Sequence, residues 1–451
     1  MRGCLIEFLL ADALKLAIET LEIVWSTKTS VKSAFYKASE KHGVSDIRAL
    51  RMAYRIAYES IKNLNLVDAI AEFMLGKERY SMLPSIVKNI LRVIVYEFKV
   101  NQNPSRYSLA DYTSAFRSIY SWKILQPIEP YLGRLTSLSF DQAKFSELDR
   151  IALTYRQPKW IVEYLERTLG RSLALEILEG LQSEPKIYIR INTFKIGLNE
   201  CLKMLEDEGF KLKPVDKIPY VYVLEDYEKP IPLSKAYRDG LIQVQDLSSC
   251  YSVVLLDPKP GERILDLCAA PGIKTSYLVQ LASGEVDIIS IDVSIKRILL
   301  MKSLMEKSSI ENAGIIVADG RYLPLANIEF DAVLLDPPCS GTGILHRDPS
   351  FKWRLTYKGI TKFASLQYEL LESASRYVKS GGRIVYSTCS LTLEENELVI
   401  ERFLRLNPEF YLSKPKLMLG SDGLRGLNYA RRLYPHRDLC NGFFVAVIRR
   451  V

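Results

Sequence analysis

Strand-like and helical stretches alternate from about residue 260 onward. The strand-like runs are rich in β-branched and other apolar residues and lie at residues 263–268, 286–292, 314–319, 331–336, 383–388 and 443–450. Apolar strands separated by helices are typical of a parallel sheet that helices cover on both faces. We therefore predict a doubly wound, Rossmann-like α/β sheet for this part of the chain.

Aspartates mark the carboxyl ends of the first four of these strands. They are Asp266, Asp292, Asp319 and Asp336. Ligands of open parallel sheets bind at the carboxyl ends of the strands, whereas a buried strand end gains no stability from an unpaired carboxylate. The sequence therefore predicts a ligand-binding site at this edge of the sheet.

A loop of small residues follows the first strand and leads into a helix. The loop comprises Cys268, Ala269, Ala270, Pro271, Gly272, Ile273 and Lys274. Small side chains let a ligand approach the backbone, and the helix N-terminus favours the negative end of that ligand. Asp292, at the tip of the second strand, is placed to bind a ribose diol. Because the loop lacks the G-x-G-x-x-G pattern of dinucleotide sites, we expect S-adenosylmethionine rather than NAD.

Two cysteines each follow a strand of the predicted sheet. Cys339 lies in the segment D-P-P-C-S-G that begins at Asp336, where amine methyltransferases carry an aromatic residue, and Cys389 lies in S-T-C-S. A thiolate that adds to carbon 6 of a pyrimidine makes carbon 5 nucleophilic. That chemistry also needs an acid near the ring nitrogen and a base for the carbon-5 proton. Cysteine is also a common small core residue, but a pair beside this turn favours the pyrimidine chemistry.

Three domains are expected from the patterns along the chain. Residues 1–135 carry apolar positions at helical spacing and are predicted to be all-helical. The pattern weakens over residues 135–155, where we expect a linker. Residues 156–240 are predicted to form a small α+β module, and residues 241–451 the domain with the parallel sheet.

The small module contains strand-like runs at residues 187–194 and 220–225, with a helical stretch at residues 199–210 between them. Arg190 and Lys195 lie in or beside the first run. They either face RNA or belong to an ordinary packing unit, and the sequence favours neither interpretation.

Composition excludes several classes of protein. The net charge of +8 permits binding to a polyanion without requiring it. Seven scattered cysteines, three histidines and the absence of a C-x-x-C pair disfavour both a disulfide framework and a zinc site. The longest apolar runs fall short of the ~20 residues that a membrane span needs. We therefore expect a monomer in the reducing cytoplasm, with no metal and no membrane contact.

The motifs together resemble the Nop/Sun-type RNA cytosine-5 methyltransferases. The resemblance covers residues 156–451 and rests on DLCAAPGIKT, LLDPPCSGTG, GGRIVYSTCS and the late GFFVA. The helical first third is similar to a NusB-type RNA-binding bundle, most clearly in LPSIVKNILRVIVYEF. This arrangement resembles the RsmB group, whose members modify ribosomal RNA.

The resemblance implies roles for individual residues. Cys389 would be the nucleophile, Cys339 would help to release the product, and Asp336 would hold and protonate the cytosine edge. The implied contacts of S-adenosylmethionine are the loop Cys268 to Lys274 together with Asp292, Arg297, Asp319 and Asp336. This sequence departs from the family pattern at Ile273, which replaces a glycine, and at Pro337, which replaces an alanine.

Three alternatives stay open or are disfavoured at this point. A transfer-RNA methyltransferase would use the same chemistry as an enzyme of ribosomal RNA. An RNA-binding ribosome-assembly factor with little catalysis would keep the fold, but the intact cysteine pair argues against it. A DNA methyltransferase is disfavoured because the T-C-S motif is present and no separate target-recognition domain is visible.

Overall fold

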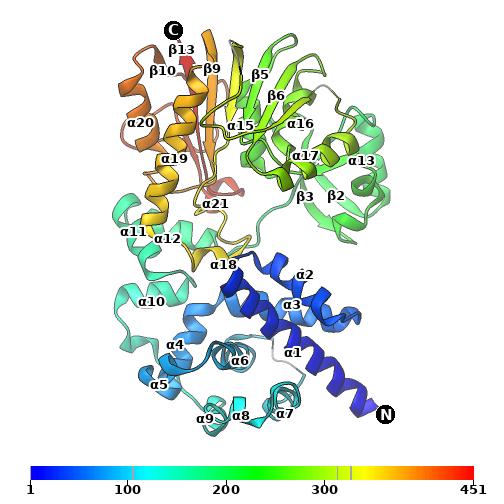
Figure 1. Cartoon of the computed structure of the whole chain (residues 1–451), viewed down its shortest axis with the longest axis vertical. Coiled ribbons are helices and arrows are strands. Elements are labelled where there is room, and N and C mark those ends of the chain that lie inside the picture. Colours follow the sequence, from blue (N-terminus) through cyan, green and yellow to red (C-terminus); the bar gives the residue numbers. More distant parts are fainter. Residues whose placement is uncertain (1, 104–105, 312, 326–327) are drawn as a thin grey trace. The chain divides into compact units, whose positions relative to one another are not determined.

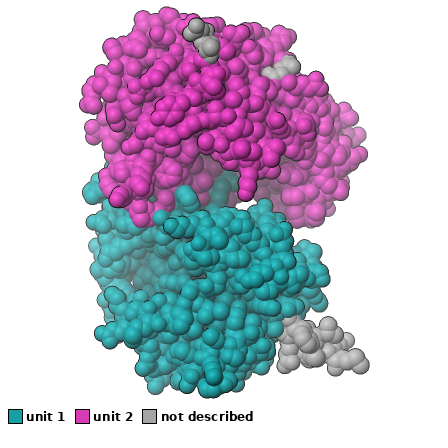
Figure 2. All heavy atoms as spheres, in the orientation of Figure 1, with its two compact units in different colours: residues 1–182, 345–354 teal, residues 183–344, 355–451 magenta. Residues whose placement is uncertain are grey.

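The computed structural model describes residues 2–103, 106–311, 313–325 and 328–451, with side chains from residue 9 onward. These residues group into two compact units (Figure 2). Unit 1 contains Met1–Gln182 and Leu345–Arg354, and unit 2 contains Ser183–Ile344 and Leu355–Val451. None of the described helices combines the length and the apolar composition that crossing a bilayer requires. The division into residues 1–135, 156–240 and 241–451 stays a proposal, because compactness alone does not show which parts fold independently.

Unit 1 is helical throughout its described residues (Figure 1). Its elements are α1 (Arg2–Thr27), α2 (Val31–His42), α3 (Ile47–Lys62), α4 (Leu64–Leu75), α5 (Lys77–Met82), α6 (Ser85–Val95), the π-helix η1 (Tyr96–Val100), α7 (Leu109–Tyr120), α8 (Trp122–Leu125), α9 (Glu129–Leu135), the 3-10 turn η2 (Gln142–Lys144), α10 (Glu147–Thr154), α11 (Lys159–Leu169), α12 (Arg171–Gly180) and α18 (Pro349–Lys352).

The core of unit 1 follows from the helical spacing of its apolar residues. Ala53 and Ala57 on α3 are fully buried, and α1 packs along this helix. Small side chains let two helices approach closely. The side chain of Asp46 caps α3 by accepting a hydrogen bond from the backbone of Arg48 at 2.8 Å. The prediction of a helical first third is confirmed.

The linker predicted over residues 135–155 is partly wrong. Residues 147–154 form α10, and Leu153 is buried in the helical core. The side chain of Ser146 caps this helix by accepting from the backbone of Asp149 at 3.2 Å. A helix this short gives only a weak periodic pattern, so its sequence resembles that of a linker.

A segment that follows Cys339 in the sequence belongs to the helical unit. The indole nitrogen of Trp353 donates to the carbonyl of Ile61 at 2.7 Å, and Tyr58 donates to the carbonyl of His346 at 3.1 Å. The ammonium group of Lys352 is buried and donates to the carbonyl of Lys62 at 3.1 Å. Helix α3 therefore binds residues 345–354 through backbone carbonyls as well as apolar packing.

Unit 2 contains a four-stranded antiparallel sheet with the strand order β2-β3-β1-β4. The elements of this module are β1 (Tyr188–Ile191), α13 (Leu198–Asp207), β2 (Phe210–Pro214), β3 (Val221–Tyr227), η3 (Ile231–Leu233), α14 (Lys235–Arg238) and β4 (Ile242–Val244). The expected strands and helix are present. The strands β2 and β4 were not predicted, because lysines alternate along β2 and β4 has only three residues.

Arg190 does not face RNA. Its side chain is 3% exposed, and its guanidinium donates to Gln245 at 2.9 Å and to the hydroxyl of Ser276 at 2.5 Å. Lys195 is exposed, but its ammonium group donates to the carbonyl of Asp239 at 2.7 Å. Because β1 is buried along its whole length, a charged residue in it is buried too, and it is tolerated because it finds hydrogen-bond partners.

The described residues also form a nine-stranded sheet, with β11-β12-β13-β9-β8-β5-β6-β7 as its main path and β10 paired to β13. Its elements are α15 (Leu247–Leu256), β5 (Arg263–Leu267), α16 (Ile273–Leu281), β6 (Asp287–Asp292), α17 (Ile295–Lys307), β7 (Ala313–Val317), β8 (Phe330–Leu335), α19 (Tyr357–Ser375), β9 (Val378–Thr388), α20 (Glu397–Leu406), β10 (Phe410–Leu412), β11 (Ser421–Asp422), β12 (Arg431–Leu433), α21 (Pro435–Asp438) and β13 (Phe443–Arg450).

Both faces of this sheet are covered, which confirms the Rossmann-like prediction. Ile264 belongs to one buried cluster with Tyr277 of α16, and the next residue, Leu265, belongs to another with Leu371 of α19. Strands β5 to β9 pair in parallel. The expectation of a wholly parallel sheet is wrong for β13, which pairs antiparallel to both β9 and β12. The chain reaches β13 from β12 through the short helix α21 rather than through a long crossover, and a short connection favours antiparallel pairing.

Candidate active site

Two cavities that share Cys268 lie at the carboxyl ends of the parallel strands. The first, called the Asp292 cavity, has a volume of about 180 Å³ and is lined by Leu267, Cys268, Ile291, Asp292, Val293, Arg297, Ala318, Asp319, Gly320, Arg321, Pro338, Leu366 and Leu370. The second, called the Lys274 cavity, has a volume of about 200 Å³ and is lined by Val244, Gln245, Asp246, Ser249, Asp266, Cys268, Ala269, Ala270, Pro271, Ile273, Lys274 and Asp336. Every residue predicted to contact the cofactor except Gly272 lines one of them.

The carboxylate of Asp292 is buried and held from two sides. One oxygen accepts from the backbone of Ser294 at 2.9 Å, and the other accepts from the backbone of Ala270 at 3.2 Å. The guanidinium of Arg297 lies 3.0 Å from the second oxygen. A carboxylate has about four acceptor positions, so these three contacts leave about one for a ligand hydroxyl.

The far wall of the Asp292 cavity combines a carboxylate with apolar side chains. Arg321 lies 2.6 Å from Asp319, and hydrogen bonds from its guanidinium lower the pKa of that carboxyl group. Gly320 lies close to Leu370, and a Cβ atom at this position would be only 2.8 Å from that side chain. The lining of the cavity therefore combines the carboxylates of Asp292 and Asp319 with apolar side chains, which suits a ring joined to a ribose.

Lys274 and Asp336 form an ion pair in the lining of the Lys274 cavity. The ammonium group of Lys274 lies 2.5 Å from Asp336, whose other oxygen accepts from the hydroxyl of Ser387 at 3.2 Å. Asp266 is buried beside them and accepts from Thr275 at 2.6 Å. Burial raises the pKa of Asp266 to about 7. Of these two carboxyl groups at strand ends, Asp336 alone has a cation within ion-pair distance.

The loop between these cavities depends on one glycine. Gly272 has a φ of +93°, a conformation that side chains rarely adopt, and a Cβ atom there would lie 2.7 Å from Met301. The next residue, Ile273, begins α16 and lines the Lys274 cavity. The departure from the family pattern at Ile273 therefore falls on the wall of that cavity.

The two predicted cysteines meet. Cys339 follows β8, Cys389 follows β9, and their sulfur atoms are 2.8 Å apart. Both residues are partly exposed. The hydrogen bond to Cys389 and the loss of hydration raise the pKa of Cys339 well above its usual value, and the negative charge of Glu395 adds to this shift. The two sulfur atoms therefore lie within hydrogen-bond distance, and either thiol can donate to the other.

Two polar residues of the site escaped sequence analysis. Glu395 accepts hydrogen bonds from the residues that follow both cysteines, Ser340 and Ser390, at 2.7 Å each. Gln367 donates to Glu395 at 3.0 Å and to the carbonyl of Pro338 at 2.9 Å. The serine after each cysteine and the acidic run E-E-N-E were the available signals.

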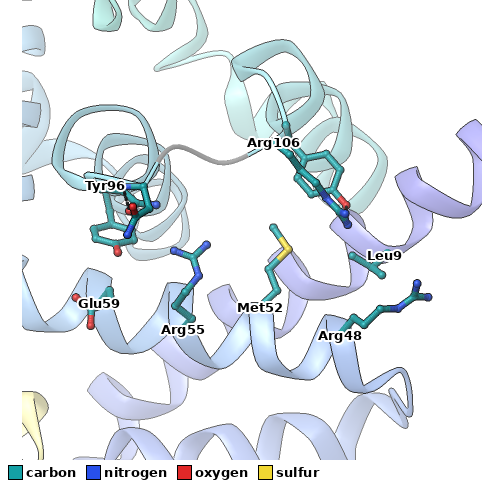
Figure 3. Close-up of a pocket in the computed structure, with 10 residues that line it drawn as sticks. Leu9, Arg48, Met52, Arg55, Glu59, Tyr96 and Arg106 are labelled. Carbon is teal, nitrogen blue, oxygen red and sulfur yellow. Dashed lines mark hydrogen bonds between the residues drawn. The ribbon is translucent and has the colours of Figure 1, made fainter.

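A hollow of about 580 Å³ lies within unit 1 (Figure 3). Its lining residues come from a different part of the sequence than those of the two cavities above. Figure 3 shows Met52 and Arg55 of α3 reaching into it toward Tyr96 and Arg106. Its lining also includes Leu9, Arg48, Glu59, Asn101, Asn103 and Tyr107. Arg55 lies 3.0 Å from Glu97, so part of the basic lining is already neutralised.

Most of the chain from residue 157 onward matches models of known protein families. Residues 253–449 match the family model of 16S rRNA methyltransferase RsmB/F, and residues 157–229 match an RsmF/B-like ferredoxin-like domain. The chain is 31% identical to the ribosomal RNA small subunit methyltransferase B of Salmonella arizonae over 346 residues, which cover 77% of that protein. This chain belongs to the RsmB/F methyltransferase family. The resemblance inferred from the motifs is thereby confirmed.

Relatives of this chain differ in length. The 25S rRNA (cytosine-C(5))-methyltransferase nop2 of Schizosaccharomyces pombe is 34% identical over 335 residues, which are 71% of this chain and 54% of that protein. The chain therefore spans about half the length of this relative. The crystal structure of PH0851 matches 98% of this chain and 99% of its own, with a TM-score of 0.83 and 29% identity. All of the predicted site residues lie inside the stretch that the RsmB/F model matches.

Proposed function

We propose that this protein transfers a methyl group from S-adenosylmethionine to carbon 5 of a cytosine in RNA, and that ribosomal RNA is the substrate. The observation that carries the proposal is the pair of sulfur atoms 2.8 Å apart at the ends of β8 and β9. Relatives named as methyltransferases of ribosomal RNA support this substrate over transfer RNA. The described cysteines are free thiols, which suits a reducing cytoplasm.

The residues around the two cavities fit S-adenosylmethionine. We assign the ribose and adenine to the Asp292 cavity, where Asp292 has an acceptor position free and Leu370 forms an apolar wall. We assign the methionine end to the loop from Cys268 to Lys274, at the start of α16. When bound there, S-adenosylmethionine would supply the methyl group on its sulfonium to an electron-rich carbon, with the thioether S-adenosylhomocysteine as the leaving group.

The chain's own residues prepare that carbon. In the proposed mechanism the thiolate of Cys389 forms a bond to carbon 6 of the cytosine, and the electrons of the double bond move to carbon 5. Asp336, held by Lys274 and Ser387, binds the cytosine edge, and the proton that it passes to the ring comes from the ammonium group of Lys274, 2.5 Å from its carboxylate. Cys339 assists the later elimination, in which a base takes the carbon-5 proton, the double bond re-forms and Cys389 leaves as a thiolate.

Methylation of defined RNAs tests the function directly. The purified chain would be incubated with labelled S-adenosylmethionine and with unmodified transcripts of small-subunit ribosomal RNA, large-subunit ribosomal RNA or transfer RNA. We expect label in 5-methylcytidine from a ribosomal transcript after digestion to nucleosides. Label in transfer RNA alone would contradict the proposed substrate, and RNA binding without label would favour an assembly factor.

Loss of Asp292 should weaken cofactor binding. In Asp292→Ala the ligand loses one charge-assisted hydrogen bond, worth about 1.5–3 kcal/mol, so the Kd for S-adenosylmethionine should rise about tenfold to a hundredfold in calorimetric titration. Asp287→Ala is the matched control, because Asp287 begins the same strand and pairs with Arg263 on the surface. Equal affinity in both variants would remove Asp292 from the cofactor site.

We further propose that the helical unit holds RNA, as its NusB resemblance implies. Arg48 and Arg106 both line the hollow of Figure 3, and Arg48 is an exposed residue of α3. Deleting residues 1–139 would be a poor test, because Trp353 and Lys352 would lose their partners on α3. Substitutions in the whole chain avoid this problem.

The double variant Arg48→Ala/Arg106→Ala should bind RNA more weakly. The slope of log affinity against log salt concentration should become shallower by about one for each phosphate that an arginine no longer neutralises. Filter binding over a range of salt concentrations measures this slope. Lys41→Ala serves as the control, because Lys41 is an exposed cation of the same unit that does not line the hollow. An unchanged slope in the double variant would show that these arginines do not contact phosphate.

A further inference from the structure

Both cysteine loops are bonded to one fully buried carboxylate, that of Glu395. One oxygen accepts from the backbone nitrogen of Ser340 at 2.7 Å and from Gln367 at 3.0 Å. The other accepts from the hydroxyls of Ser390 and Thr392 at 2.7 Å each, and from the hydroxyl of Ser340. Because all five partners donate, the acceptor set matches an ionised carboxylate.

The hydrogen bonds of Glu395 link it to the residue that follows each cysteine. Ser340 directly follows Cys339, and Ser390 directly follows Cys389. The backbone adds a second tie, since the nitrogen of Gly343 donates to the carbonyl of Cys389 at 2.9 Å. A side chain bonded to the residue after each cysteine holds the backbones of the two cysteine loops together, which keeps the sulfur atoms within reach of each other.

We propose that Glu395 is a positioning residue that locks the two cysteine loops together and assigns the thiolate to Cys389 rather than to Cys339. The inference rests on the proposed function only where it has the thiolate attack carbon 6 of a cytosine. The hydrogen bond to Cys389 and the loss of hydration raise the pKa of Cys339, and the charge of Glu395 raises it further. The sulfur of Cys389 lies 2.8 Å away, within reach of the Cys339 thiol. A thiol that donates to a neighbouring sulfur stabilises the negative charge on that sulfur.

Two substitutions separate the two parts of this role. In Glu395→Gln the remaining amide oxygen can still accept from Ser340 and Gln367, and the hydroxyls can turn to accept from the new amide, so the loops stay joined while the charge is lost. In Glu395→Ala both the bonds and the charge are lost. Glu394→Gln is the matched control, because Glu394 is the preceding residue and accepts from the exposed Tyr357 at 2.9 Å.

Alkylation by iodoacetamide over a range of pH, with each cysteine followed by mass spectrometry, measures the result without RNA or methyl transfer. In the wild type and in Glu394→Gln, Cys389 should react first. In Glu395→Gln the pH profile of Cys339 should move to lower pH, so the preference for Cys389 should fall. Calorimetric titration with S-adenosylmethionine should give the same Kd in all three proteins, which shows that they are folded.

The outcomes separate this inference from the proposed function. An unchanged profile of Cys339 in Glu395→Gln would overturn the assignment of the thiolate. A low kcat with an unchanged KM for S-adenosylmethionine in Glu395→Ala supports the positioning role, and wild-type kcat in that variant would overturn it. If the wild type methylates no RNA but the alkylation profile still shifts, the proposed function fails and the electrostatic role of Glu395 stands.

Discussion

Cys389→Ala is expected to abolish both turnover and any covalent complex between the protein and RNA. Without the sulfur no bond forms to carbon 6, and carbon 5 of cytosine stays too poor a nucleophile to take a methyl group. The loss of a nucleophile in a covalent enzyme lowers kcat by on the order of 10⁴-fold or more. The choice of Cys389 as nucleophile is the one that the resemblance to the family implies, and Cys339 lies 2.8 Å from it, where either sulfur can donate to the other.

Denaturing gels with labelled RNA measure the covalent species, and label in 5-methylcytidine measures turnover. Cys201→Ala is a suitable control, because Cys201 is buried in the core of the small antiparallel sheet. Binding of S-adenosylmethionine should be unchanged in both variants. Residual turnover within tenfold of the wild type in Cys389→Ala would exclude it as the nucleophile.

Much of the site could be predicted because its residues follow strands. The apolar runs identify β5 to β9, and the carboxyl ends of parallel strands meet at one edge whatever the connecting helices look like. Asp292, Asp336, Cys339 and Cys389 therefore reach the same edge by topology alone. Local sequence contains this information, since each residue comes directly or within a few positions after its own strand.

The partners of these residues could not be predicted in the same way. Glu395 bonds to Ser340 across 55 positions of the chain, and Arg190 bonds to Gln280 across 90. Such pairs depend on how loops and helices pack in three dimensions, and hydropathy even gives the wrong expectation for a buried guanidinium. The antiparallel pairing of β13 was not predicted for a related reason, because the apolar pattern of a strand does not show whether it runs parallel or antiparallel to its neighbours.

The contrast between the two sulfur atoms leads to a different expectation for Cys339→Ala. The nucleophile acts before methyl transfer, whereas a residue that assists elimination acts after it, so their losses stop different steps. Attack by Cys389 and methyl transfer should still occur in Cys339→Ala. Elimination should then be slow, because the departing sulfur of Cys389 has lost the thiol 2.8 Å away that stabilises it as a thiolate.

Cys339→Ala should therefore accumulate a methylated protein–RNA adduct, visible as a slowly migrating band that carries label from both RNA and S-adenosylmethionine. Product release should fall while adduct formation continues, so the band should grow toward one equivalent of protein. Label from S-adenosylmethionine in the band distinguishes a complex stalled after methyl transfer from one stalled before it. A band in Cys389→Ala and none in Cys339→Ala would reverse the two roles. Absence of a band from both variants, with turnover intact in Cys339→Ala, would argue that Cys339 takes no part in elimination.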